Sequence, residues 1–263
     1  MPGEPINEAM VRQAAERHGF DWHYRHDTAS TNADVLRYQQ QHQREVVAVS
    51  ESQSAGRGRR GREWLSPFAR NIYCTIGIAK EIPASSQGLL SMVTGLALCR
   101  ALEQTAAAMV SLKWPNDLLF EGRKLGGILI ESRPLDETRF YFAIGFGLNV
   151  FMTAEELAEI SQPAASLAQI AVAEIDRTQV LTASIDMVIR SIRDFDHNAV
   201  QQLIAEFARF DFFHDLPVDV IAGGSRIRGI NRGITADGQL QLETEQGIEL
   251  HSAAEISLRA VAE

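Results

Sequence analysis

The chain has few cysteines, no long uninterrupted hydrophobic run and no excess of positive charge. Only Cys74 and Cys99 occur in 263 residues, which is too few for a disulfide framework and favours a reducing compartment such as the cytoplasm. The longest apolar stretch, 89–102, contains polar residues and is too short to span a bilayer, so it predicts a buried helix. The net charge of −9 and the isoelectric point of about 5.3 argue against a dedicated nucleic-acid binder, because binding phosphates requires a basic surface.

The composition is that of a globular protein with a sizeable core. Hydrophobic residues make up 45% of the chain and charged residues 22%, and this length predicts one large domain or a large domain with a small one. The first residues lack the basic start and apolar run of a secretory signal. Sequence patterns predict helices over 7–18, 85–107, 154–160 and 178–208, the last with a break near His197. A further helix is predicted to begin at a polar turn over 28–32 and to run to about residue 44. They predict strands over 22–26, 46–49, 71–79, 110–113, 118–120, 125–132 and 139–150, with 121–124 as a hairpin turn.

The character of the sequence changes near Arg209. Short alternating strands separated by turn signals follow, at 218–221, 227–230, 239–243 and 248–250. This pattern predicts a small, partly open barrel. We therefore expect one domain over 1–208 and a second over 209–263.

A loop at 56–62 has the most unusual composition in the chain, with four arginines and three glycines in seven residues. Glycines allow backbone N–H groups to approach a ligand closely. Guanidinium groups bind anions such as carboxylates and phosphates through two parallel hydrogen bonds. The loop alone also fits a solvated charge run or a nucleic-acid-binding tail.

Two polar segments gain meaning beside this loop. The Ser30-Thr31-Asn32 sequence stands where a strand leads into a helix, so it fits either a binding site or a helix cap. The 113–117 segment, Lys-Trp-Pro-Asn-Asp, brings a cation, an amide and a carboxylate to a chain reversal, although an ordinary turn has the same composition.

Two glycine-containing strands complete the pattern. Lys124 precedes the Gly126-Gly127 pair at the start of an apolar strand, where glycines often mark the close approach of a ligand. The alternating Gly145 and Gly147 remove side chains from one face of another strand and predict a slot. The seven histidines and two cysteines show no spacing typical of a zinc site.

The order of these motifs along the chain closely resembles the biotin protein ligases, from about residue 27 to 150, and segments 210–217 and 255–259 resemble the C-terminal module of that family. The resemblance implies an α+β fold: a mixed β-sheet with helices on one face, similar to class II aminoacyl-tRNA synthetases, followed by an SH3-like β-barrel. It implies that biotin and ATP form biotinyl-5′-AMP and pyrophosphate, with Mg²⁺, and that biotin then passes to a lysine of the biotin carboxyl carrier protein of acetyl-CoA carboxylase. It allows for a homodimer, and we expect no nucleic-acid or membrane partner.

The resemblance also assigns roles to single residues. Lys124 and Arg59 would be catalytic, stabilising the anions that meet during activation. The biotin site would comprise Ser30, Thr31, Asn32, Gln53, Gly56, Arg57, Gly58, Arg59, Lys124, Gly127, Gly145 and Gly147. The ATP site would comprise Arg57, Arg59, Arg62, Trp64, Lys113, Asn116 and Asn149. Asp117 would hold Mg²⁺ or orient the acceptor amine, and Trp64 would either cap the adenine or pack in the core.

The chain also departs from parts of the family pattern. Only about 20 residues precede the first expected strand, which predicts a ligase-only form without an N-terminal DNA-binding domain. The alternatives are a lipoate ligase, which we expect to lack the arginine loop, a biotin-sensing DNA-binding regulator and an RNA-binding protein. The last two are opposed by the acidic isoelectric point. Pyrophosphate release with biotin, with lipoate or with neither separates these functions.

Overall fold

A seven-stranded mixed sheet forms the centre of the larger part of the molecule. The computed structural model describes residues 3–171, 174–222, 225–253 and 256–260. The strand order is β1-β2-β3-β7-β6-β5-β4, with β1 parallel to β2 and the other neighbours antiparallel. The strands are β1 (Asp21–Arg25), β2 (Val46–Ser50), β3 (Ile72–Glu81), β4 (Ser111–Lys113), β5 (Asp117–Phe120), β6 (Arg123–Pro134) and β7 (Arg139–Leu148). The expected mixed sheet is confirmed.

The helices lie close to their predicted positions. They are α1 (Glu8–Arg17), α2 (Thr31–His42), α3 (Leu89–Ala106), α4 (Ala154–Ala158), α5 (Leu167–Ile170), α6 (Arg177–Asp194) and α7 (Val200–Phe210). The break predicted near His197 is a 3₁₀ turn over His197–Ala199, between α6 and α7. Another 3₁₀ turn, Ala84–Ser86, precedes α3, and the short α5 was not predicted.

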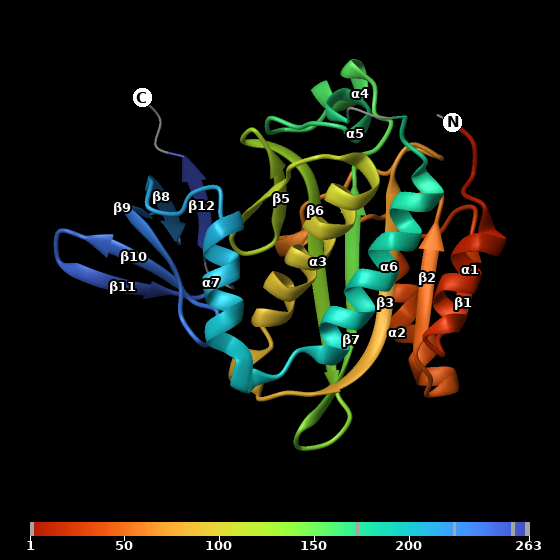
Figure 1. The fold of residues 1–263 in the computed structure, drawn as a ribbon, viewed down its shortest axis with the longest axis horizontal. Coiled ribbons are helices and arrows are strands. Elements are labelled where there is room, and N and C mark those ends of the chain that lie inside the picture. Colours follow the sequence, from red (N-terminus) through yellow and green to blue (C-terminus); the bar gives the residue numbers. More distant parts are fainter. Residues whose placement is uncertain (1–2, 172–173, 223–224, 254–255, 261–263) are drawn as a thin grey trace.

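The two faces of the sheet are covered by different helices. Val47 and Val49 of β2 belong to the main core, whereas Val46 and Ala48 pack in a second cluster with Val35 of α2. Figure 1 shows α3 and α6 together on one face, and α2 therefore covers part of the other. The expectation of helices on one face only is wrong. The cause is visible in β2, whose continuous apolar run is typical of a strand buried on both sides.

The C-terminal part is a five-stranded antiparallel sheet in the order β11-β10-β9-β8-β12. The strands are β8 (Pro217–Ala222), β9 (Ser225–Ile234), β10 (Leu240–Thr244), β11 (Gly247–His251) and β12 (Ile256–Ala260). Four were predicted and β12 was not. Among the residues that the structure describes, β11 and β12 are the edges and are not paired with each other, so the barrel is open. Glu255, the first residue of the 255–259 segment, lies outside the described residues.

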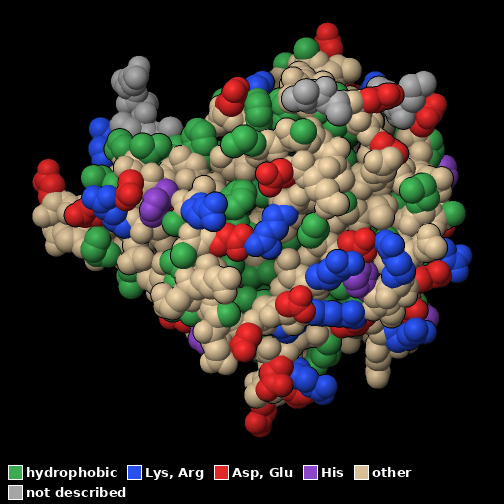
Figure 2. Space-filling model, viewed as in Figure 1, with side chains coloured by type: hydrophobic (Ala, Val, Ile, Leu, Met, Phe, Trp, Pro, Cys, Tyr) green, Lys and Arg blue, Asp and Glu red, His purple; other side chains and the backbone are tan. Residues whose placement is uncertain are grey.

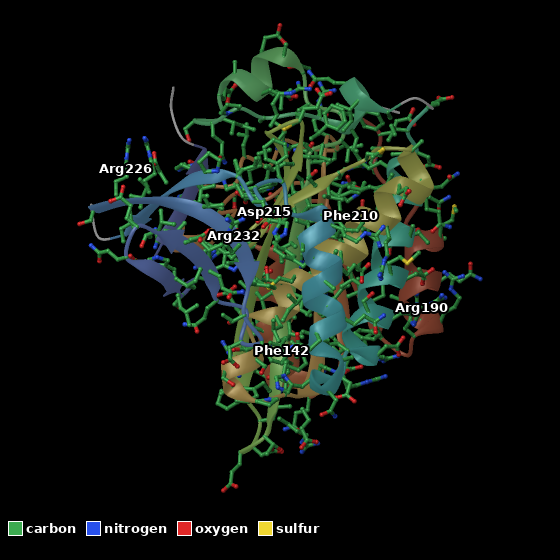
Figure 3. The ribbon with its side chains drawn as sticks, turned by 60° about the vertical axis from the view of Figure 1, so that its left-hand side comes forward. Phe142, Arg190, Phe210, Asp215, Arg226 and Arg232 are labelled. Carbon is green, nitrogen blue, oxygen red and sulfur yellow. The ribbon has the colours of Figure 1, made fainter. Side chains whose placement is uncertain are left out.

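The second sheet packs against the end of the first where β4 turns into β5. The buried Trp114 donates a hydrogen bond from Nε1 to the carbonyl of Gly238 at 3.0 Å, and the Phe212 amide donates to the Leu112 carbonyl at 2.8 Å. Nη1 of Arg232 in β9 lies 2.6 Å from Oδ1 of Asp215, which follows α7 in the chain (Figure 3). The boundary at 209 stays a prediction, although α7 ends at Phe210.

The surface and the cysteines agree with the composition. Figure 2 shows Lys and Arg side chains interspersed with Asp and Glu over the face in view. Cys74 and Cys99 are free and buried, as expected. No helix within the described part of the chain is long and apolar enough to cross a bilayer.

Candidate active site

A cavity of about 890 Å³ lies between the N-terminus of α2, the arginine loop, the open ends of β5 to β7 and strand β12. This volume is in the range of small-molecule sites, roughly 300–1,000 Å³. The structure brings almost every predicted site residue to its wall: Ser30, Thr31, Asn32, Gln53, Arg57, Gly58, Arg59, Arg62, Trp64, Lys113, Asn116, Asp117, Lys124, Gly127, Gly145, Gly147 and Asn149.

Gly56 is the exception, since it closes the base of the arginine loop and does not line the cavity. The loop is a small hairpin in which the Trp64 amide donates to the Gly56 carbonyl at 2.9 Å and the Gly58 amide to that of Arg62 at 2.7 Å. A Cβ atom on Gly56 would lie 2.7 Å from the carbonyl oxygen of Trp64. Gly56 is therefore required by the approach of the two backbone segments, which local composition did not reveal.

The predicted glycine slot is present, but side chains of the protein itself fill part of it. Gly127 and Gly147 are directly paired on neighbouring strands, and Gly145 lies on the same face. A Cβ atom on Gly145 would lie 2.1 Å from Oδ1 of Asn32, and one on Gly147 would lie 2.6 Å from the indole of Trp64. The glycines thus allow Asn32 and Trp64 to lie directly on the sheet.

Trp64 is half-buried beside the cation that the sequence singled out. Its ring lies 5.4 Å from Nζ of Lys124, within the range of a cation–π contact. Its Nε1 is buried and has no hydrogen-bond partner within the described part of the chain. Trp64 therefore packs on the sheet inside the cavity, and its role toward the adenine stays a prediction.

A polar network occupies the end of the cavity at α2. The backbone amide and hydroxyl of Thr31 lie 3.0 and 3.2 Å from Oε1 of Gln53, and the buried Thr75 hydroxyl lies 2.8 Å from Oγ1 of Thr31. Asn32 donates from Nδ2 to Oε2 of Glu131 at 2.8 Å. Sequence reasoning missed Thr75 and Glu131, although Glu131 follows Gly127 at an even spacing and so shares its face of β6.

Ser30 bears on the choice between a helix cap and a binding residue that the sequence left open. It occupies the N-cap position of α2, as a helix-capping serine would, yet its side chain makes no capping hydrogen bond. Because Ser30 also lines the cavity, its hydroxyl is available to a ligand.

A cluster of three charges lies at the other end of the cavity. Nζ of Lys124 is 2.7 Å from Oδ1 of Asp117, and Nζ of Lys113 is 3.3 Å from Oδ2. Burial alone would raise the pKa of Asp117, but the two ammonium groups outweigh it and hold the pKa below its usual value. Burial lowers the pKa of Lys113 despite the attraction of Asp117.

This cluster does not fit a magnesium site at Asp117. Both carboxylate oxygens are engaged by ammonium groups, which repel a divalent cation. No group of three or more His, Cys, Asp or Glu side chains placed to hold a metal occurs among the described residues. We therefore derive no step through a metal bound at Asp117.

Arg59 connects the arginine loop to both sheets. It donates from Nη1 to Oδ1 of Asn116 at 3.3 Å and from Nη2 to the backbone carbonyl of Ala253. Burial lowers the pKa of its guanidinium, whereas the side chains of Arg57 and Arg62 are exposed. Asn116 is itself fixed, since its Nδ2 donates to the Ile128 carbonyl at 2.7 Å.

Asn149 holds a loop that forms one wall of the cavity. Its Nδ2 donates to the Ala165 carbonyl at 3.1 Å, and the backbone of Lys124 pairs with Pro163 and Ala165 at 2.8 and 2.9 Å. The predicted nucleotide contact of Asn149 remains a prediction. Leu258 and Arg259 of β12 complete the wall of the cavity. No sequence pattern within the first 208 residues indicated that the C-terminal part contributes to it.

One end of the cavity is thus lined by uncharged polar side chains, the middle is lined by glycines and an indole, and the far end carries cations. Such a cavity suits a ligand with a hydrogen-bonding head, an apolar body and an anionic tail. Fixed ammonium and guanidinium groups can stabilise negative charge that gathers at that tail during a reaction.

Comparisons with known proteins agree with this geometry. Residues 22–149 match the Biotin/lipoate A/B protein ligase family, and 216–259 match the Biotin protein ligase C terminal domain. The chain is 36% identical over 215 residues to the bifunctional ligase/repressor BirA of Salmonella typhimurium, covering 81% of this chain and 67% of that protein. It is 32% identical over 263 residues to the biotin–[acetyl-CoA-carboxylase] ligase of Mycobacterium tuberculosis, covering 96% of this chain and 95% of that one. The structure is similar to the biotin protein ligase from Aquifex aeolicus in complex with biotin and ATP, with a TM-score of 0.77 and 26% identity over 92% of this chain and 99% of that chain.

Proposed function

This chain belongs to the biotin protein ligase family, and we propose that it converts biotin and ATP to biotinyl-5′-AMP and transfers biotin to a lysine of a biotin carboxyl carrier protein of acetyl-CoA carboxylase. One observation carries the proposal. A single cavity joins the Thr31–Gln53 network to Lys124 across the glycines of β6 and β7. Biotin has the matching order of groups, with a ureido ring, an apolar body and a carboxylate.

In the first step, a carboxylate oxygen of biotin attacks the α-phosphate of ATP. An O–P bond forms while the bond to pyrophosphate breaks, so no nucleophile from the protein is required. Two anions must approach each other, and fixed cations lower the barrier to this approach. We assign this role to Lys124, held at 2.7 Å from Asp117, and to Arg59 at the mouth of the arginine loop.

In the second step, the amine of the acceptor lysine attacks the acyl carbon of the adenylate. The C–N bond forms, AMP leaves with the electrons of the C–O bond, and the amine loses a proton. Asp117 is buried and ionised beside two lysines. We propose that it positions Lys124 and Lys113 throughout, and that magnesium enters with the nucleotide phosphates.

The decisive experiment measures pyrophosphate release by the purified chain with ATP and Mg²⁺, supplied with biotin, with lipoate or with neither. We expect pyrophosphate to be released when biotin is supplied, and not when lipoate or neither acid is supplied. Label should then pass from biotin to a biotin carboxyl carrier domain. Release with lipoate alone would instead identify a lipoate ligase. A folded protein that labels no carrier domain would contradict the proposal.

The cellular setting and assembly are part of the same proposal. We place the reaction in the cytoplasm because both cysteines are unpaired and buried, which suits a reducing compartment. A homodimer remains a prediction, which sedimentation of the purified chain would test.

A further inference from the structure

We propose that Glu131 is a positioning residue that sets the direction of the hydrogen bonds with which this site binds biotin. The inference rests on the proposed function and deepens it. Glu131 lies on β6, on the same face as Gly127 and Leu129, and pairs across with Ala143 of β7. Its carboxylate accepts a hydrogen bond from Nδ2 of Asn32 at 2.8 Å.

The carboxylate fixes which way the Asn32 amide faces. Nδ2 of Asn32 donates to Glu131 and, at 3.2 Å, to the carbonyl of Leu129. Both partners are acceptors only, so a flipped amide would place its oxygen against two oxygens. Oδ1 of Asn32 must therefore face the other way, where it lies 2.7 Å from the Thr75 hydroxyl.

The Thr75 hydroxyl transmits this direction across the sheet. Thr75 is fully buried, and because Oδ1 of Asn32 can only accept, the Thr75 proton points toward Asn32. Oγ1 of Thr75 then offers only lone pairs to Oγ1 of Thr31, 2.8 Å away. The Thr31 hydroxyl proton is thereby directed to Thr75 or to Oε1 of Gln53, 3.2 Å away, and the lone pairs of Thr31 Oγ1 are left for a ligand.

Gln53 is oriented by the same network. Its Oε1 accepts from the backbone amide of Thr31 at 3.0 Å, so its Nε2 faces away and, among the described residues, donates a long bond to Ser66 at 3.4 Å. The site therefore presents an acceptor at Thr31 and donors at Gln53 and Ser30. This set matches part of a cyclic urea, whose carbonyl oxygen accepts from the donors and one of whose two N–H groups donates to Thr31.

The test replaces the carboxylate by an amide of equal size. In Glu131→Gln the new amide can offer an N–H to Asn32, so that the Leu129 carbonyl alone still opposes the reversed network. We expect the dissociation constant for biotin, measured by calorimetry without ATP, to rise about tenfold or more. We expect kcat at saturating biotin and KM for ATP to stay within about twofold, because the cation cluster is untouched.

Two variants of Thr75 test the transmission independently. Thr75→Val removes the hydroxyl at similar size and should weaken biotin binding to a similar extent. Thr75→Ser restores the hydroxyl and should bind biotin nearly as the wild type does. Glu137→Gln, at an exposed glutamate, is the matched control and should change nothing.

The outcomes are distinct. If Glu131→Gln binds biotin as tightly as the wild type does, the inference is wrong while the proposed function stands. If the variant loses kcat and affinity for ATP as much as affinity for biotin, Glu131 has only a structural role and the inference is again wrong. If the wild type itself neither binds biotin nor releases pyrophosphate, the proposed function and this inference both fail.

Discussion

Lys124 and Asp117 form a buried ion pair, with Nζ 2.7 Å from Oδ1, on two neighbouring strands of the sheet. The sequence pattern predicted a hairpin turn over 121–124, with Lys124 at its end. The structure places the turn at Glu121 and Gly122, whose φ angles are 49° and 76°, and begins β6 at Arg123. Lys124 is thus part of the sheet, and its charge is held in place before any substrate binds.

We predict that Lys124→Ala lowers biotin-dependent exchange of pyrophosphate into ATP by at least about 100-fold, the usual effect of removing one group that stabilises a developing anion. The fold should survive because Asp117 keeps Lys113 as its partner. Arg123→Ala, at the preceding and more exposed residue, should leave the exchange rate within about twofold. Wild-type exchange in a folded Lys124→Ala protein would remove this lysine from the site.

Arg59→Gly should separate activation from retention of the intermediate. Arg59 links the arginine loop to Asn116 and to the Ala253 carbonyl, whereas we propose that Lys124 acts at the reacting carboxylate. Loss of one charge-assisted hydrogen bond, roughly 1.5–3 kcal/mol, should speed escape of the adenylate by about one to two orders of magnitude. Escaped adenylate acylates lysines of unrelated proteins, so blotting a lysine-rich bystander for biotin measures the leak.

Arg60→Gly is the control for Arg59→Gly, since it removes the same charge from the same loop at an exposed position with φ of 59°, which glycine adopts without strain. The Arg60→Gly enzyme should biotinylate the bystander protein much less than the Arg59→Gly enzyme does. An active Arg59→Gly enzyme that labels no more bystander than the wild type does would refute the retention role.

The parts of the fold that sequence predicted are those with strong local patterns. The long strands and α3 have such patterns, and the break between α6 and α7 was also visible. The face of the sheet on which α2 packs could not be predicted, because β2 is apolar on both faces. The short β12 was missed since its pairing with β8 joins segments about 40 residues apart, and such pairing leaves little local signal.

The site shows the same division. Motifs in the sequence pointed to residues whose type and spacing stand out locally, such as Lys124 and the arginines of the loop at 56–62. Thr75 and Glu131 are ordinary strand residues that matter only because strand pairing brings them to Asn32, 43 and 99 positions away. Arg259 reaches the cavity only because the second sheet packs at Trp114.

We predict that the buried pair of Glu51 and Arg177 is a large contributor to stability. Nη2 of Arg177 lies 2.6 Å from Oε2 of Glu51, and both side chains are almost fully buried. Glu51→Gln leaves the guanidinium buried without its counter-charge, so unfolding in urea should show a loss of about 3–5 kcal/mol. Glu16→Gln breaks an exposed pair with Arg12 and should cost less than about 1 kcal/mol. Equal losses in the two variants would show that the buried pair is not special.

A buried carboxyl at the junction with the second sheet should make stability depend on pH. Asp211 accepts hydrogen bonds from Nδ2 of Asn231 at 2.7 Å and from the Phe213 amide at 3.1 Å. Burial nevertheless raises its pKa, and these bonds only partly oppose the shift. Between the pKa of an unfolded aspartate, about 3.9, and the raised folded value, the folded state therefore holds more protons than the unfolded state.

The sign of the effect follows from this difference. The contribution of Asp211 is fully present below about pH 3.9 and is lost as pH rises through the folded pKa, so this group lowers the unfolding free energy over that window. Asp211→Asn does not titrate and should remove that fall when urea unfolding is compared at several pH values from about 4 to 7. Asp215→Asn is the control, because hydrogen bonding to Arg232 lowers the pKa of Asp215 and gives it the opposite sign. If the Asp211→Asn protein keeps the wild-type pH dependence, the carboxyl at this junction does not titrate as the structure indicates.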